Sequence, residues 1–386
     1  MAQKVMFFGA GLSKAFDFPV TGQILPLMID GIRQYHWKGK SWLYKEDEPN
    51  QQLYISWLQL LLFRLSPGIP RFFTDKNIDR KGLENAGLPL VTDLLSQLDH
   101  LLASAQDIYD WNFNGTYTAS VSIAHIGSRI DLKLLKTIFE WGIISAIGQT
   151  KAREIVALNP LFDYIKKINR RGKRDFITTI TTNYDPLLEW NFLDDGEAYY
   201  ACDRVDYGFS WRDVDDIGTI RPRPSKPKFA VFKLHGSFDW LKCERCGYIY
   251  VNPTSSIYTL AYSNVKEDRN TCHCGHWPLK PVIVTPSYIR SVFDTNLHEI
   301  WKASLEALRK ADEWILVGYS LPNEDFNIKS LFLRAYAGRK KKPRVTVVQY
   351  KDEARGRYEN FFEENQVDYQ NEGLEPFVKK YIKPLR

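Results

Sequence analysis

Six short apolar runs constrain the fold of this chain more than any other feature of its sequence. Each run is rich in β-branched or aromatic residues and is bounded by turn residues, as the buried strands of a parallel sheet are. They are residues 4–8, 176–181, 229–234, 282–285, 314–317 and 345–350. Helical patterns lie between several of them, most clearly at 297–310. This alternation predicts an α/β fold with a doubly wound, Rossmann-like parallel sheet.

The interval between the first two runs has a different pattern. It contains amphipathic helical stretches without a convincing series of strands, at residues 21–35, 51–65, 91–105 and 132–147. We therefore expect 21–170 to be a large helical insertion, and 1–20 together with 171–386 to form the core. The aromatic residues of the insertion fit an oligomer surface or, as composition favours, burial in a hydrophobic core. Residues 203–227, rich in Asp, Gly, Arg and Pro, are predicted to form a surface loop.

Composition narrows the class of protein. The 386 residues are 44% hydrophobic and 25% charged, which is typical of a soluble globular protein with one large domain or two. The net charge of +6 is mild for this length, so it suits an anionic cofactor without requiring a nucleic acid. The basic run at 338–344 fits a solvated connector between a helix and a strand better than it fits a nucleic-acid patch.

The apolar stretches also bear on location. The longest, near residues 54–65, is far too short to span a membrane, and Gly9 comes too early for a signal peptide. We therefore expect a cytoplasmic protein without a membrane partner. In that compartment the five cysteines indicate a metal site or reduced thiols rather than disulfides. Cys202 stands apart from the other four and is expected to be simply packed or exposed.

A glycine-rich loop follows the first apolar run. It contains Gly9, Ala10 and Gly11, with Ser13 two residues further on. Glycines at this place let a backbone approach a pyrophosphate, and a helix that follows offers N–H groups. Ser13 would then cap that helix or touch a phosphate. Taken alone, Gly-x-Gly is explained equally well by a plain tight turn.

Polar residues follow three of the other runs. The second run ends in TTNYD with Asn183 and Asp185, the third in KLHGS with His235, and the fifth in VGYSLPNED with Gly318 and Ser320. Because the carboxyl ends of parallel strands meet at one edge, these groups would converge beside the glycine loop. There a neutral imidazole can accept a proton from a sugar hydroxyl. Read singly, these motifs also fit an Asx turn, a structural histidine and an ordinary strand-to-helix turn.

Two close cysteine pairs lie within residues 240–280, in the segments CERCG and CHCGH. They are separated by 25 residues (272 − 246 − 1) and consist of Cys243, Cys246, Cys272 and Cys274. Such pairs can close a tetrahedral zinc site, and four thiolates leave no open position, so the metal would be structural. Gly247 and Gly275 would permit the tight turns. The alternatives are four unmetallated thiols, or a site in which His273 or His276 replaces one cysteine.

The order of these motifs resembles the sirtuin family. That family has a GAG-x-S loop, a TQN-x-D motif, an HG histidine, a four-cysteine zinc module and a late G-x-S loop. The resemblance covers the sheet core and the zinc-ribbon-like module, but not the helical insertion or about the last 35 residues. It implies that NAD is the ligand. The implied cofactor-binding residues are Gly9, Ala10, Gly11, Ser13, Thr182, Gly318, Tyr319 and Ser320, and the implied catalytic residues are His235, Asn183 and Asp185.

The chain departs from the pattern of deacylating sirtuins at several positions. Asp17 stands where the family has glycine, Val20 and Thr21 replace its aromatic-Arg pair, and Thr182 replaces its glutamine. An FGE-type segment that helps to bind an acyl-lysine peptide reads VTPS here, at 284–287. With these departures the chain resembles the bacterial sirtuin-like NADases of anti-phage defence, in the form of stand-alone chains paired with a HerA-type ATPase.

That resemblance implies an NAD+ hydrolase that releases nicotinamide and ADP-ribose. It also implies an assembly that gates the activity, as a homo-oligomer and with the ATPase or another defence protein as partner. The alternatives are an NAD-dependent protein deacylase, which needs a peptide groove, and a non-catalytic NAD or ADP-ribose sensor. Dispersed basic residues, and a cysteine module without an adjacent base-reading helix, argue against direct nucleic-acid binding.

Overall fold

The computed structural model forms two compact units. Unit 1 is Met1–Asp17, Ala152–Val284 and Ser291–Arg386, and unit 2 is Phe18–Lys151 and Thr285–Arg290. The described residues are 3–38, 51–103, 132–148, 155–171, 176–192, 205–216, 218–252, 257, 260–261, 266–284, 295–323 and 325–382. Cys202 and residues 285–287 of the VTPS segment therefore lie outside the described residues. No described helix is both long and apolar enough to cross a membrane.

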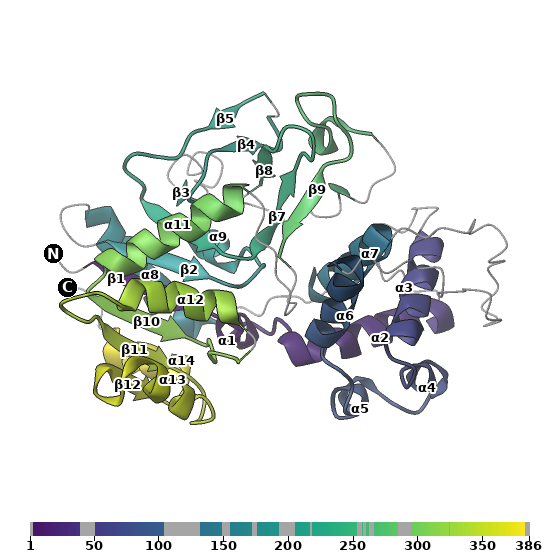
Figure 1. Cartoon of the computed structure of the whole chain (residues 1–386), viewed down its shortest axis with the longest axis horizontal. Coiled ribbons are helices and arrows are strands. Elements are labelled where there is room, and N and C mark those ends of the chain that lie inside the picture. The colour runs from purple at the N-terminus through teal and green to yellow at the C-terminus, as the bar shows by residue number, and fades with distance from the viewer. Residues whose placement is uncertain are drawn as a thin grey trace. The chain divides into compact units, whose positions relative to one another are not determined.

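A seven-stranded parallel sheet is the centre of unit 1 (Figure 1). Its order is β12-β11-β10-β1-β2-β6-β3, and every pairing within it is parallel. The strands are β1 Lys4–Phe8, β2 Ile177–Thr181, β3 Val205–Asp206, β6 Phe229–Lys233, β10 Glu313–Val317, β11 Arg344–Val348 and β12 Val367–Gln370. The predicted doubly wound α/β fold is confirmed, and five of the six apolar runs are strands of this sheet.

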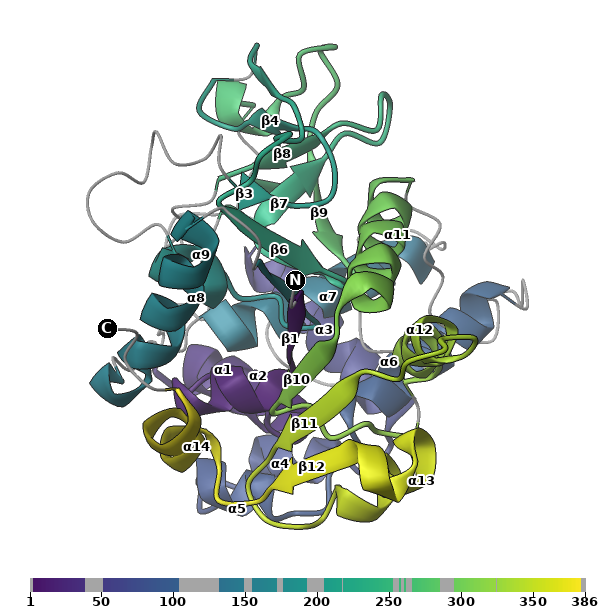
Figure 2. The same ribbon diagram turned by 90° about the vertical axis from the view of Figure 1, so that its left-hand side faces the viewer.

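Helices cover both faces of this sheet, as Figure 2 shows. They are α1 Ala10–Ala15, α8 Asn159–Arg171, α9 Leu187–Phe192, α11 Thr295–Lys310, α12 Phe326–Tyr336, α13 Arg355–Phe362 and α14 Leu374–Tyr381. Helices α8, α9 and α14 lie on one face, and α11, α12 and α13 on the other. Phe7 of β1 is fully buried and makes an edge contact with Phe332 of α12, with ring centroids 5.0 Å apart. Burial on both faces explains why these strands are apolar throughout.

Unit 1 also contains a second sheet, which the sequence did not predict. It has five strands in the order β5-β4-β8-β7-β9: β4 Trp211–Asp213, β5 Ile220–Arg221, β7 Gly236–Lys242, β8 Ile249–Val251 and β9 Lys280–Ile283. Residues 282–285 were expected in the parallel sheet, which is wrong, because β9 pairs antiparallel with β7. A short apolar run has the same pattern in either kind of sheet, so periodicity cannot assign it.

The prediction of a surface loop at 203–227 is also wrong in part, since this stretch contributes β3, β4 and β5. Its aromatic side chains are buried: Tyr207 and Phe209 make edge contacts with Trp240 of β7, with ring centroids 5.5 and 5.0 Å apart. The burial of these rings outweighs a local composition that favours turns.

The described part of unit 2 consists of helices and their connections. The helices are α2 Thr21–Lys38, α3 Gln51–Leu65, α4 Pro70–Thr74, α5 Arg80–Glu84, α6 Val91–Ala103 and α7 Leu132–Gly148. The four helical stretches predicted here are confirmed, although α4 and α5 were not foreseen. Aromatic residues of this unit pack on one another, as Phe63 does on Phe73 at 5.2 Å and Tyr54 on Trp141 at 6.0 Å between ring centroids.

The start of α1 and the loop after β10 meet where the strand order reverses, between β1 and β10; the predicted glycine-rich loop is therefore the first turn of a helix. The Gly11 N–H donates to the Gly318 carbonyl at 2.8 Å, and the Gly9 N–H donates to the Val317 carbonyl at 2.9 Å. A Cβ on Gly11 would lie 2.5 Å from the Gly318 Cα, and Gly318 itself has φ +62. Only glycines allow this backbone contact, which fixes the two loops against each other at the carboxyl edge of the sheet.

We predict that Gly11→Ala lowers the free energy of unfolding by about 1–3 kcal/mol, because the added methyl group collides with backbone rather than with a flexible side chain. Chemical denaturation followed by circular dichroism measures the change. Gly356→Ala is the matched control, since a Cβ there meets nothing within 4 Å and the residue lies in α13. If Gly11→Ala and wild type had equal denaturation midpoints, the close contact between Gly11 and Gly318 would not be needed for stability.

Candidate functional site

Three polar side chains from two loops are joined directly at the carboxyl edge of the sheet. The Asn183 amide donates to the Ser13 hydroxyl at 2.6 Å and to the Gly9 carbonyl at 3.0 Å. The Ser13 hydroxyl donates in turn to Asp185 Oδ2 at 2.7 Å. Ser13 and Asp185 are buried and Asn183 is half-buried, so this chain of hydrogen bonds is largely shielded from water.

The same three residues are fixed by their backbone surroundings. The second oxygen of Asp185 accepts from the Leu187 N–H at 3.2 Å, which is the Asx turn that begins α9. The Asn183 N–H donates to the Thr181 hydroxyl at 3.0 Å, and the Thr182 N–H donates to the Phe8 carbonyl at 3.2 Å. The turn and the functional interpretation of this motif are therefore compatible, because the turn orients the carboxylate.

His235 lies beside this group, two residues after the end of β6 at Lys233. It is buried, and its carbonyl accepts from the Val284 N–H at 2.8 Å. The Tyr184 ring centroid is 6.2 Å from that of His235, and the Tyr184 hydroxyl donates to the Val284 carbonyl at 2.7 Å. Since β2 and β6 are adjacent and parallel, Asn183, Asp185 and His235 lie at the same edge.

The predicted cofactor residues after β1 and β10 are differently placed. The N–H groups of Gly9 and Gly11 are already paired with the β10 loop, so these glycines serve the contact between the loops. The Tyr319 ring packs on Phe7 with centroids 5.0 Å apart, and its hydroxyl donates to Asp325 at 2.7 Å. Ser320 is exposed at the loop surface. The Tyr319 ring is therefore part of the hydrophobic core and is not exposed at the edge of the sheet.

Three residues that sequence reasoning missed support the Tyr319–Ser320 loop. Gln349 and Tyr358 both donate to the Tyr319 carbonyl, and Arg357 donates to the Ser320 carbonyl at 2.9 Å. They lie after β11, in or near the final part of the chain where no motif was recognised. Their contacts are to backbone atoms, which leave no distinctive residue pattern in the sequence.

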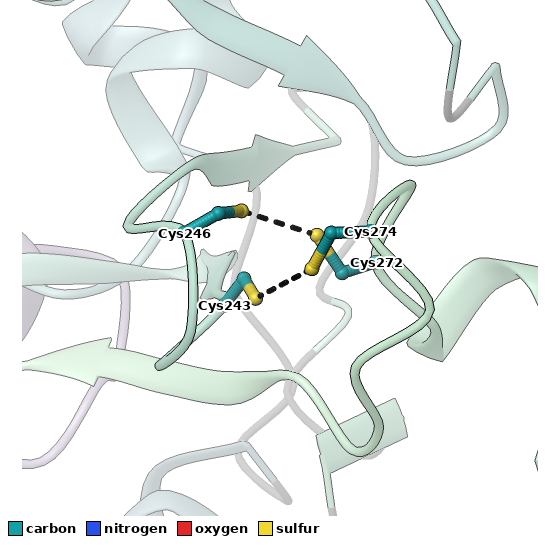
Figure 3. Close-up of side chains that lie close together, drawn as sticks. All are labelled: Cys243, Cys246, Cys272 and Cys274. Atoms are coloured by element: carbon teal, nitrogen blue, oxygen red, sulfur yellow. Dashed lines mark hydrogen bonds between the residues drawn. The ribbon is translucent and has the colours of Figure 1, made fainter.

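The four predicted cysteines come together in unit 1 (Figure 3). Their sulfur atoms all lie within 4.8 Å of one another, with 3.7 Å between Cys243 and Cys274 and 3.4 Å between Cys246 and Cys272. Tetrahedral zinc with bonds of about 2.3 Å separates sulfurs by about 3.8 Å, so the set fits zinc closely. Four sulfurs fill the coordination sphere, which suits a structural metal.

The surroundings of the cysteines support the same conclusion. Gly247 and Gly275 have φ +78 and +80, so the two tight turns require the conformation that glycine favours, as expected. The imidazole of His273 is 3.0 Å from the Tyr250 hydroxyl, and the four cysteines form the cluster without it. Burial raises the pKa of the Cys272 thiol to about 12 in the absence of a metal, so a bound cation must displace its proton.

Comparison with known proteins agrees with this geometry. Residues 177–370, just over half of the chain, match the model of the SIR2-like domain. The chain belongs to the SIR2-like domain family. No curated protein matches it significantly.

Solved structures similar to this SIR2-like chain share little sequence with it. One, described as "Structural Basis for the Mechanism and Regulation of Sir2 Enzymes", is 15% identical, with a TM-score of 0.37 and coverage of 99% of this chain and 91% of that chain. Another, "Sir2-p53 peptide-NAD+", is 11% identical, with a TM-score of 0.38 and coverage of 98% and 90%. Such low values leave the chain's own residues as the basis for any functional conclusion.

We predict that the SIR2-like chain binds about one zinc ion and that Cys246→Ser loses it, because a hydroxyl is a poor substitute for a thiolate ligand. Cys246 is exposed, so this change removes a ligand with little effect on packing. Elemental analysis by mass spectrometry measures the metal content. Cys202→Ser, which changes the fifth cysteine, is the matched control and should keep the zinc. Equal zinc in both variants would contradict the assignment.

Proposed function

We propose that the protein is an NAD+ hydrolase that cleaves the bond between nicotinamide and ribose. The observation that carries this proposal is the hydrogen-bonded set of Ser13, Asn183 and Asp185, with His235 near it, at the carboxyl edge of the parallel sheet next to the switch point. Ligands of doubly wound sheets bind at such a switch point.

The reaction needs little activation of the leaving group. Nicotinamide leaves as a neutral molecule, taking the electron pair of its bond to C1′, and positive charge develops on the ribose as in glycoside cleavage. The site must therefore hold the ribose, favour positive charge at C1′ and admit water to one face. Water then adds to C1′ and loses a proton, which gives ADP-ribose.

Each residue of the site has one role in this scheme. Asp185 stabilises the positive charge, since its carboxylate is fixed at both oxygens by Ser13 and Leu187. Asn183 orients the ribose or the attacking water. His235 hydrogen-bonds the ribose hydroxyls and takes the proton as general base.

The remaining contacts hold NAD by its other parts. We assign the phosphates to the loop of Gly9, Ala10, Gly11 and Ser13. We assign the nicotinamide-ribose part of NAD to Thr182. We assign its adenosine part to Gly318, Tyr319 and Ser320. Because the glycine N–H groups are used between the loops, we expect close backbone contact with the ligand rather than N–H donation from Gly9 and Gly11. Zinc, when bound by the four cysteines, stabilises the small second sheet and takes no part in the chemistry.

Contacts around Val284 support our proposal of hydrolysis rather than deacylation. An acyl-lysine peptide would need backbone partners near Val284, but the Val284 N–H is bonded to His235 and its carbonyl to Tyr184. The departures at Asp17 and Thr182 point in the same direction. Asp17 has φ +66, which lies in the left-handed region that glycine favours.

An NAD hydrolase that is always active would be toxic to its own cell, so we propose that assembly gates this one. The gate would be a homo-oligomer, with a HerA-type ATPase or another defence protein as partner. The biological role that follows is depletion of NAD as the effector of anti-phage defence in a bacterial cytoplasm.

We predict that Asn183→Ala and His235→Ala each abolish NAD consumption, because each removes a group that contacts the ribose or the water. Nucleotide chromatography after incubation with NAD, with the chain alone and with candidate partners, measures the loss. His298→Ala is the matched control, since His298 is an exposed histidine on α11 and should leave activity unchanged. Unchanged consumption by both site variants would rule out the assigned roles.

The products separate the alternatives. Release of nicotinamide and ADP-ribose without a peptide supports the hydrolase. Formation of O-acetyl-ADP-ribose only with an acetylated peptide would identify a deacylase. Binding of NAD that is recovered intact, with and without partners, would identify a sensor.

A further inference from the structure

A buried ammonium group lies directly beneath the Asn183–Asp185 segment. Lys233, at the carboxyl end of β6, is fully buried, and its Nζ donates to the carbonyl oxygen of Asp185 at 2.6 Å. The same Nζ lies 3.1 Å from Glu189 Oε1, and Glu189 of α9 is also fully buried. The lysine thus joins the backbone of the segment to the helix that follows it.

A second contact holds the neighbouring peptide unit. The Tyr184 carbonyl accepts from the Phe238 N–H at 3.0 Å and lies 3.0 Å from the Ser237 hydroxyl, which also bonds the buried Asp239. Ser237 has one proton for these two acceptors. It can donate to Tyr184 when a protonated Asp239 donates to Ser237, and burial does raise the pKa of Asp239. Two consecutive carbonyls are therefore bound, that of Tyr184 by groups of β7 and that of Asp185 by Lys233 of β6.

If every carboxyl group of this cluster were ionised, the negative charges would outnumber the single positive charge of Lys233. The ammonium of Lys233 forms an ion pair with Glu189, and the charges of Asp239 and Asp185 also act on it. Burial opposes the charge on Lys233, but the surrounding carboxylates outweigh burial and raise its pKa, so the lysine is charged at neutral pH. Burial also raises the pKa of Glu189 to about 7, and Lys233 only partly offsets this.

The contribution of such a cluster to the stability of the fold does not explain why it is present. A buried ion pair rarely stabilises a fold more than apolar residues of the same volume would. The direction of the lysine gives a reason for its presence: it donates to the one segment that carries both Asn183 and Asp185.

We propose that Lys233 is a positioning residue of the hydrolase site. Its ammonium holds the Asp185 carbonyl so that the Asn183 and Asp185 side chains face Ser13, while Glu189 holds the ammonium in an ion pair. The catalytic part of this inference rests on the proposed function, whereas the positioning itself concerns only the backbone of residues 181–188.

The variant Lys233→Met keeps the aliphatic chain and removes the ammonium. It also leaves Glu189 without its cation, so the double variant Lys233→Met/Glu189→Gln removes both charges together. If Lys233 only balances the charge of Glu189, the double variant restores wild-type behaviour. If it positions the Asp185 carbonyl, the double variant remains impaired, and it also carries the measurement if the single variant does not fold.

Lys4→Met is the matched control. It breaks another ion pair of the same sheet, in which Lys4 Nζ lies 2.9 Å from Glu313 at the amino ends of β1 and β10, away from the site. This variant should keep the turnover number and the exchange of residues 181–188 unchanged.

Protonation of Glu189 gives an independent readout. Its pKa is raised from near 4.5 to about 7 in the folded protein. Protonated Glu189 therefore contributes fully to the stability of the fold below about pH 4.5, and this contribution is lost as the pH rises through about 7. The melting temperature of wild type should fall relative to that of Glu189→Gln between about pH 5 and about pH 8. Parallel profiles would show that the pKa of Glu189 is not raised in the folded protein, and a permanently charged Glu189–Lys233 pair would replace the protonated state in this cluster.

The deciding experiment is hydrogen–deuterium exchange by mass spectrometry on the full chain. For Lys233→Met/Glu189→Gln we expect residues 181–188 to exchange at least about tenfold faster than in wild type, while β1 is unchanged. With NAD, kcat should fall about 10- to 100-fold with little change in KM. If residues 181–188 of the double variant exchange at the wild-type rate, Lys233 does not position this segment. A wild type that leaves NAD intact under all conditions defeats the proposed hydrolase, but the exchange result still decides the role of Lys233.

Discussion

The backbone contact between Gly11 and Gly318 is the constraint on which the site depends. It joins the loops after β1 and β10 at van der Waals distance, with N–H to carbonyl bonds in place of side chains. Because Gly11 and Ser13 both lie in α1, this contact also fixes the position of Ser13. Ser13 then reaches across β1 and β2 to Asp185. A shift of either loop would separate the groups that the Ser13 hydroxyl connects.

The second constraint acts on the backbone of the segment that carries Asn183 and Asp185. The peptide units of Tyr184 and Asp185 have their carbonyls bound by groups of β6 and β7, while the side chains of Asn183 and Asp185 are bound by the Ser13 loop. The segment is therefore fixed on two sides by atoms that would make no contact with a substrate. In the reaction that we propose, a site fixed in this way would need little reorganisation as positive charge develops.

The sequence predicted most of the sheet, because strands buried on both faces are apolar throughout and stand out from their surroundings. It also predicted the four cysteines, since their spacing reflects the chemistry of the metal directly. It missed β3 and β12 of the parallel sheet, and it missed the second sheet, in which β4, β5, β8 and β9 have only two to four residues each. There, long-range contacts such as that of Phe209 with Trp240 decide the structure, and a local pattern does not contain them.

Lys233 shows where a residue-by-residue reading stops. The run FAVFK ends in a charged residue within an otherwise apolar strand, and a charge in such a place indicates a buried partner. The partners, Glu189 and Asp239, lie 44 residues before it (233 − 189) and 6 after it (239 − 233), in a helix and in another sheet, so no spacing rule connects them. A motif search finds His235 because families share it, and passes over Lys233 two residues earlier. The cost of burying an ammonium is the physical reason to regard this lysine as part of the site.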